Sequence, residues 1–451
     1  MISLDNLKEI LYISDHLDLI KWRLVSKDFK NIIDSLSFNI SIYTACKLGY
    51  YLVFKKYMNS YFNLNYALIK ASEGGHLLMV KLLISKGAHV FISAFNIACE
   101  YGRIEIIKYL YNTYKICSSV GLYEIGVKCY EQIIDYFSTT DFNFWIPIYH
   151  GACKSGNMEI IKNIPEPISL LESIKNACES GNLKLVEYLF NKCSEPITDL
   201  TLYSYLVKSS TYGHIDIVKF LIPKCKTIYW ENIIINSIES GNIELVNYLL
   251  QFSNQVDWNR ALIAATMSNN IELVKLVISK EVTNFNDCMY IACSKGNKEI
   301  LNLLINNGAN NWNEGLFGAC RTGNIEFINL MIKRGADNFD EAIIWACYSR
   351  NFNAVKLLME KIKNKSTLND VLETYSHFYD NLEQIKYIVD KGATDFKYTF
   401  LQSCKIGNLE VVEYFLQKGY KIDDGLIIEN SIDNNLLTEL FLKYNVMNDV
   451  H

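Results

Sequence analysis

The sequence predicts an all-α fold, a solenoid of about 15 short helix-turn-helix repeats. One motif recurs along the chain, for example as "IACSKGNKEILNLLINNGAN" at 291–310 and "GACRTGNIEFINLMIKRGAD" at 318–337. Its fifteen copies have an average spacing of about 27.5 residues, within the roughly 20 to 50 residues that mark solenoid repeats. Apolar residues recur inside each copy at helical spacing and lack the alternation of strands.

The centre of each repeat is predicted to be a turn at which a helix ends. Counting the first residue of "GN" as position zero, ten copies carry Gly there and two carry Asn. These residues adopt the left-handed conformation most readily, and that conformation ends helices. Cys129, Arg350 and Asp380 depart from the pattern. The zero positions are 49, 75, 102, 129, 156, 181, 213, 241, 269, 296, 323, 350, 380, 407 and 434.

Two antiparallel helices are predicted to flank this turn. Before it, small or apolar residues at positions −8, −7, −4 and −3 share one helical face, as Ala342, Ile343, Ala346 and Cys347 do. After it, ten copies have Asn at position +1, such as Asn324, and many have an acid two residues later. An N-cap side chain and a carboxylate in the first turn begin a second helix.

This motif resembles the ankyrin repeat, whose family pattern is Ala-Ala-x-x-Gly-His/Asn-x-Glu-Val-Val-x-x-Leu-Leu-x-x-Gly-Ala. The resemblance covers about nine-tenths of the chain. The family's Thr-Pro-Leu-His is absent, since "NEGL" stands at Asn313–Leu316, and the period is below the family's roughly 33 residues. The short period implies that the β-hairpin finger is reduced to a loop. Short repeats rich in Asn, Ile, Lys and Tyr also resemble the ankyrin proteins of giant, mimivirus-like viruses that infect amoebae.

Composition argues against several functional classes. The formal net charge of −5 and the pI near 5.9 provide no basic surface for nucleic acid. No apolar run reaches the roughly 20 residues that span a bilayer, and "MISLDNLKEI" does not resemble a signal peptide. We therefore expect a cytoplasmic, elongated monomer without nucleic-acid, membrane, metal or cofactor partners.

Aromatic residues at position −11 form a further series. A repeated large apolar side chain is usually part of a core, so we expect each ring to fill the gap left by the missing hairpin. The alternative is an exposed recognition strip. If the rings are core, Trp312→Ala costs on the order of 3 kcal/mol. The series comprises Phe38, Phe91, Trp145, Trp230, Trp258, Phe285, Trp312, Phe339 and Phe396.

The cysteines and prolines are interpreted structurally. Eight of the 13 cysteines occupy the small −3 position, which predicts reduced core thiols rather than zinc ligands or disulfides. His150 and Cys153 lie three residues apart, but no third group orients them as a catalytic pair. We therefore predict that the protein is not an enzyme. The "PEP" at Pro165–Pro167 is predicted to shorten a second helix and to bend the solenoid nearby.

The N-terminal segment lies outside the repeats and resembles an F-box. The family pattern coincides with Ile10-Leu11, Asp18-Leu19 and Val25-Ser26-Lys27-x-Phe29, although Ile2-Ser3 replaces the opening Leu-Pro. We expect an F-box-like helical module at 1–36 and the solenoid at 37–451. The alternative is a helical cap that closes the first repeat. The resemblance implies that a Skp-type adaptor of a cullin-RING ubiquitin ligase would contact Leu4, Leu7, Leu11, Leu17, Leu19 and Val25.

A stack of repeats offers a long concave surface for a protein target. Positions −6 and −2 of the first helices are expected to line it, with aromatic and Arg side chains as the strongest contacts. The predicted function is a substrate-recognition adaptor of a ubiquitin ligase. The alternative is an ankyrin scaffold, or a protein that sequesters a host factor, with no ubiquitin link. The predicted target-binding residues are Tyr290, Phe317, Arg321, Ile344 and Tyr348.

Overall fold

A computed structural model of the chain describes residues 42–51, 54, 62–138, 144–362, 364–378, 381–420 and 435–444. Every regular element in these ranges is a helix, and no described residue forms a strand. The predicted all-α repeat fold is therefore confirmed. The F-box-like segment at 1–36 lies outside the described residues.

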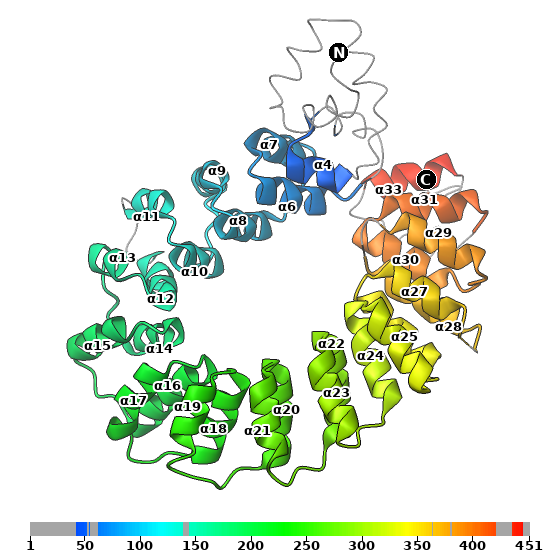
Figure 1. Cartoon of the computed structure of the whole chain (residues 1–451). Coiled ribbons are helices and arrows are strands. Elements are labelled where there is room, and N and C mark those ends of the chain that lie inside the picture. Colours follow the sequence, from blue (N-terminus) through cyan, green and yellow to red (C-terminus); the bar gives the residue numbers. More distant parts are fainter. Residues whose placement is uncertain are drawn as a thin grey trace, which may run out of the picture. The chain divides into compact units, whose positions relative to one another are not determined.

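Where its residues are described in full, a repeat consists of a first helix, a tight turn and a second helix (Figure 1). The first helices are α4 (Ile42–Leu48), α6 (Leu64–Gly74), α8 (Phe91–Glu100), α10 (Ser119–Lys128), α12 (Trp145–Ser155), α14 (Leu171–Ser180), α16 (Asp199–Thr211), α18 (Trp230–Glu239), α20 (Trp258–Ser268), α22 (Met289–Lys295), α24 (Trp312–Thr322), α26 (Phe339–Tyr348), α28 (Thr367–Ser376) and α30 (Lys397–Ile406). The second helices are α7 (Leu77–Ser85), α9 (Ile104–Tyr114), α11 (Glu131–Ser138), α13 (Met158–Asn163), α15 (Leu183–Lys192), α17 (Ile215–Leu221), α19 (Ile243–Leu249), α21 (Ile271–Ile278), α23 (Lys298–Asn306), α25 (Ile325–Arg334), α27 (Phe352–Met359), α29 (Leu382–Asp390), α31 (Leu409–Gln417) and α33 (Asn435–Lys443). Two short 3-10 helices complete the described elements, η2 (Ile222–Lys224) and η3 (Phe285–Cys288).

First helices pack on first helices, and second helices form the other layer. In Figure 1, α12, α14 and α16 follow one another in one layer while α13, α15 and α17 follow in the second. The packing divides the chain into two compact units. One contains Gly126–Cys129 and Asp141–Ser403, and the other contains the described residues before Gly126, those of 130–138 and those from Cys404 onward. The core is the apolar face that both layers share, including Leu316, Ile328 and Ile343.

The turn at position zero is conserved in conformation from repeat to repeat, even where its residue changes. All thirteen zero positions in the described ranges have a positive φ, and eleven of them are Gly or Asn. Cys129 (φ 55°) and Arg350 (φ 54°) adopt the same left-handed conformation without being Gly or Asn. The sequence register is therefore correct in these two divergent copies as well, and their turns are strained.

Among the described residues, the loops that join one repeat to the next form no hairpin, as the short period predicted. An Asn near the start of a first helix holds such a loop instead. The Oδ1 atom of Asn313 accepts the backbone N–H groups of Asp337 and Asn338, at 2.9 and 3.1 Å. Asn286 accepts those of Asn310 and Asn311 in the preceding repeat. The loop's polar groups are satisfied without a strand partner.

The aromatic rings at position −11 are neither a uniform core nor an exposed strip. Trp145 is buried, whereas the seven other rings of the series in the described ranges are half-buried. They cover the end of the second helix in the same repeat: Trp230 stacks on Phe252 at 4.8 Å, and the Arg334 guanidinium lies 5.5 Å from the Trp312 ring centre. The prediction of a buried plug is correct for Trp145 and overstates the burial of the others. Phe38 lies outside the described residues.

The "PEP" segment ends a helix as predicted. The second helix α13 has six residues, and Ile164, directly before Pro165, has the extended backbone that a following proline imposes (φ −108°, ψ 153°). The predicted bend of the solenoid in this region stays a prediction.

Candidate protein-binding surface

Neighbouring repeats are fixed to each other by the side chain at position +1. Asn242 Oδ1 caps α19 by accepting the N–H of Leu245, while its Nδ2 donates to the carbonyl of Gly213, one repeat earlier, at 2.8 Å. Asn182, Asn270 and Asn351 make the same pair of contacts. This bridge sets the spacing of the first helices, and so of the surface they form.

Longer side chains at position +1 reach a different carbonyl. The ring Nε2 of His214 lies 2.9 Å from the carbonyl oxygen of Glu179, and that of His76 lies 3.0 Å from that of Lys47. Arg103 Nε donates to Glu73 O and Tyr130 Oη donates to Glu100 O. In all four cases the acceptor is position −2 of the preceding repeat, so the bridge between repeats survives the loss of Asn.

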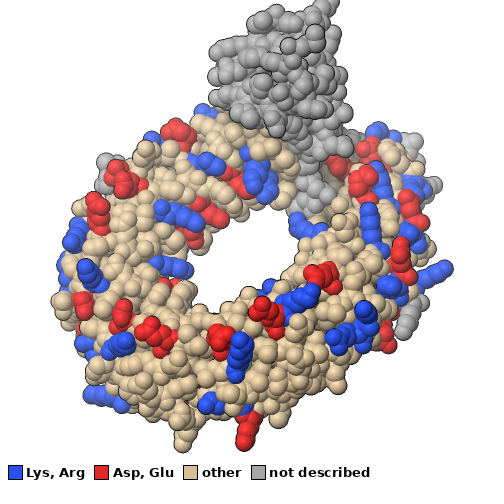
Figure 2. Space-filling view, in the orientation of Figure 1, with Lys and Arg blue, Asp and Glu red and all other residues tan. Residues whose placement is uncertain are grey.

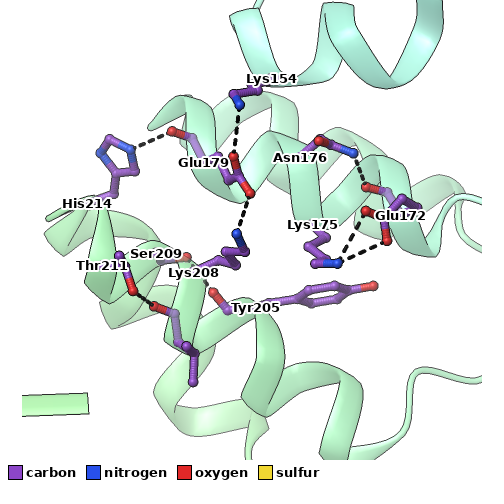
Figure 3. A network of polar contacts seen from close by, with 11 residues as sticks. Lys154, Glu172, Lys175, Asn176, Glu179, Tyr205, Lys208, Ser209, Thr211 and His214 are labelled. Carbon is purple, nitrogen blue, oxygen red and sulfur yellow. Dashed lines mark hydrogen bonds and ion pairs between the residues drawn. The ribbon is translucent and has the colours of Figure 1, made fainter. Parts of the chain in front are cut away.

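We use the name first-helix face for the surface formed by positions −6 and −2 of the first helices. In several early repeats, ion pairs occupy it. Glu179, at position −2, lies between Lys208 at 2.8 Å and Lys154 at 3.5 Å (Figure 3). Glu73 pairs with Lys47 at 2.5 Å and with Lys70 at 2.8 Å. These carboxylates join adjacent repeats and are unavailable as recognition groups.

The two carboxylates are held ionised. Burial by itself would raise the pKa of Glu179, but the hydrogen bond and the charge of Lys208, helped by Lys154, hold that pKa below its usual value. Glu73 shows the same balance: burial opposes the charge, and hydrogen bonds from Lys47 and Lys70 lower the pKa. The side chains of both glutamates are only 8–9 % exposed, so each charge depends on its two lysines.

The first-helix face differs in character at α22, α24 and α26. Arg321 in α24 donates from Nη1 to the hydroxyl of Tyr290 in α22 at 2.9 Å. The Tyr290 ring meets the edge of Trp345 at 5.9 Å, and Trp345 in turn contacts Tyr348 at 6.4 Å. Tyr348 remains 63 % exposed. Aromatic rings and an arginine thus replace the lysine–glutamate pairs.

A glycine permits this arrangement. A Cβ atom at Gly318 would lie 2.1 Å from the carbonyl oxygen of Tyr290, so α24 can approach α22 only with glycine there. Phe317, in the same helix, is 7 % exposed. We expected Phe317 to line the surface, but it is one of the buried hydrophobic residues of the core.

Ile344 and Tyr348 also line a pocket between α26 and α28. The pocket has a volume of about 510 Å³ and is open to solvent. The structure thus brings Tyr290, Arg321 and Tyr348 together through Trp345, and it places Ile344 at the edge of this group. We name this cavity the α26–α28 pocket. Its lining residues are Ile344, Tyr348, Asp370, Glu373, Thr374, His377 and Phe378.

Trp345 and the α28 residues were not predicted to belong to the surface. Positions −6 and −2 of the copy at 380 are Thr374 and Phe378. The repeat register therefore places both on the first-helix face, although neither was among the predicted target-binding residues. Asp370 and Glu373 carry no signal in sequence, because exposed acids are common on helices.

The buried thiols have no reactive environment. Burial raises the pKa of Cys46, Cys293 and Cys320 to about 12. Burial also raises the pKa of Cys153 and lowers that of the neighbouring His150, so both neutral forms are favoured. The described residues contain no group of three or more His, Cys, Asp or Glu that could hold a metal ion. A raised pKa keeps these thiols protonated and therefore weak nucleophiles.

Charges of both signs are mixed over the described part of the visible face (Figure 2). Among the described residues, no helix is long and apolar enough to cross a membrane. The fold and this surface define a helical repeat protein. We use the name aromatic contact region for Tyr290, Arg321, Trp345 and Tyr348, which contact one another.

Comparison with known families agrees with this class. Residues 234–315 and residues 289–370 each match a family model that describes three copies of the ankyrin repeat. A search of curated proteins gave no match. Together the matched segments contain α19 to α27 and therefore the aromatic contact region. Ankyrin repeats indicate a protein–protein interaction module.

Proposed function

We propose that the chain binds a protein target through the first-helix face around Tyr290, Arg321, Ile344 and Tyr348. The observation that carries this proposal is the exposed aromatic and arginine group in a row of repeats whose other −2 positions include ion-paired glutamates. Aromatic and Arg side chains contribute most of the binding energy at protein interfaces. The rigid spacing of the repeats lowers the cost of ordering these side chains on binding.

The proposal extends to the class of complex. An F-box-like segment at 1–36 would connect the target to a Skp-type adaptor and a cullin, in the cytoplasm. The chain would then be the substrate-recognition subunit of a ubiquitin ligase. Its support is the sequence pattern from Ile10 to Phe29. The resemblance to ankyrin proteins of amoeba-infecting viruses would make the target a host protein.

Two variants separate the parts of this proposal. Leu19→Asp with Val25→Asp would place charges against an apolar adaptor and abolish its binding, because an uncompensated charge is costly to desolvate. Arg321→Ala with Tyr348→Ala would weaken target binding and leave adaptor binding intact. The readouts are a pull-down with purified Skp-type adaptor and affinity purification of the full chain from expressing cells.

The outcomes identify the function. Recovery of adaptor and cullin with the wild type, and their loss with the Leu19/Val25 variant, supports the ligase subunit. Wild-type chain that fails to retain adaptor at micromolar concentration, where a known F-box protein does retain it, overturns the ligase proposal. Recovery of a single partner that depends on Tyr348 would then leave a scaffold or sequestering protein.

A further inference from the structure

We propose that the α26–α28 pocket receives a lysine or arginine side chain of the bound protein. The inference rests on the proposed function of the first-helix face and specifies the chemistry of its partner. The pocket lies where the exposed Tyr348 of α26 faces the acidic side of α28. Its lining residue Tyr348 contacts Trp345, so the pocket continues the aromatic contact region.

The pocket has two chemically different sides. Ile344 and Tyr348 supply an apolar and aromatic side from α26, and Asp370 and Glu373 supply two carboxylates from α28. Its volume of about 510 Å³ accommodates a long side chain together with part of its backbone. Lysine and arginine combine an apolar stem with a charged end, which matches these two sides.

The carboxylates of the pocket lack internal cationic partners. Within the described ranges, no Lys or Arg pairs with the side chain of Asp370 or Glu373, whereas Glu73 and Glu179 on the same face each pair with two lysines. The nearby basic groups have other contacts. Arg321 donates to Tyr290, and Arg350 lies over the ring of Phe378 at 4.3 Å. The ring nitrogens of His377, which lines the pocket, lie 3.1 Å from the Glu373 carbonyl oxygen and 3.2 Å from the Tyr398 hydroxyl.

The aromatic rings of the pocket favour a cation. The Phe378 ring already carries the Arg350 guanidinium at 4.3 Å, so Tyr348 supplies the ring for a bound cation. Tyr348 is exposed, and no cation lies over its ring among the described residues. A guanidinium or ammonium group between Tyr348 and the two carboxylates would gain a cation–π contact and charge-assisted hydrogen bonds together. An acidic side chain would be repelled there.

Immobilised hexapeptide pools test this proposal, with Arg, Lys, Gln or Glu fixed at one central position and the other positions varied. The full chain should be retained about tenfold more by the Arg and Lys pools than by the Glu pool. Asp370→Asn with Glu373→Gln should remove this preference. Asp216→Asn with Glu244→Gln is the control, since it changes the charge equally at two exposed acids outside the pocket.

The outcomes separate this inference from the proposed function. If the wild type prefers no basic pool, or if the Asp370/Glu373 variant keeps the preference, the pocket does not select a cation and the inference is wrong. If peptide binding has no charge preference but is lost in Tyr348→Ala, the first-helix face still binds protein. A thermal melt of each variant verifies that these exposed substitutions leave the fold intact, so a loss of binding is a property of the pocket.

Discussion

Asn242 bonds to its own repeat and to the previous one at the same time, since its Oδ1 caps α19 and its Nδ2 donates to the Gly213 carbonyl at 2.8 Å. Asn242→Ala removes both contacts and should cost about 2 kcal/mol, the sum of a cap and a hydrogen bond. Asn242→Asp keeps the cap and loses the bridge, so it should cost about 1 kcal/mol. Urea denaturation of the three proteins measures the difference. Equal stability of the Asp variant and the wild type would show that the bridge contributes nothing.

Arg350 occupies a left-handed turn in which other repeats have glycine. Arg350→Gly should raise the free energy of unfolding by about 1 kcal/mol, because glycine pays no Cβ penalty at φ 54°. The loss of the contact with Phe378 offsets part of this gain. Arg350→Ala is the control: it loses the contact and keeps the strain, so it should destabilise. A glycine variant less stable than the alanine variant would contradict a strained turn.

How far this fold could be predicted from sequence depends on which interactions are local. The helix ends were predictable because a left-handed turn restricts the residue at position zero, and the fifteen-fold spacing located even Cys129 and Arg350. The capping role of Asn324 was predictable for the same reason. The second role of this position, the hydrogen bond that Asn242 donates to the previous repeat, was not predictable, because it depends on how the repeats stack.

The candidate site was predicted only in part. The −6 and −2 positions identified Tyr290, Arg321 and Tyr348, because a repeated helix exposes the same positions in each copy. Phe317 was expected on the surface but is 7 % exposed, because the burial of a side chain depends on the helices that pack around it. The register of the copy at 380 places Thr374 and Phe378 on the first-helix face, but the pocket between α26 and α28 and its carboxylates Asp370 and Glu373 could not be predicted. Burial and cavity shape depend on packing between repeats, so they cannot be predicted from the sequence of one repeat.

Acid should weaken the Glu179 link between repeats. Its pKa is lowered in the folded chain, so its contribution is complete above the ordinary carboxyl pKa, near 4.5, and is lost as pH falls through the lower folded value. Glu179→Gln should be less stable than the wild type at pH 7, by about 1–2 kcal/mol, and the gap should narrow below pH 4.5. Urea denaturation from pH 7 to 3 tests this. The exposed Glu299→Gln is the control, and a gap that is independent of pH would contradict the inferred charge.

Trp312 and Trp145 occupy the same position in two repeats but differ in burial, and this difference predicts different costs of truncation. Trp145 is 4 % exposed, so Trp145→Ala should cost about 3–5 kcal/mol. Trp312 is half-buried under Arg334, so Trp312→Ala should cost less, about 2 kcal/mol, through lost apolar area and the lost cation–π contact. Arg334→Ala alone and in combination with Trp312→Ala measures the contact as a coupling energy, expected at about 0.5–1 kcal/mol. If Trp312→Ala costs as much as Trp145→Ala, the Trp312 ring belongs to the core. If the thermal melt of Trp312→Ala is unchanged, the ring instead belongs to an exposed recognition strip.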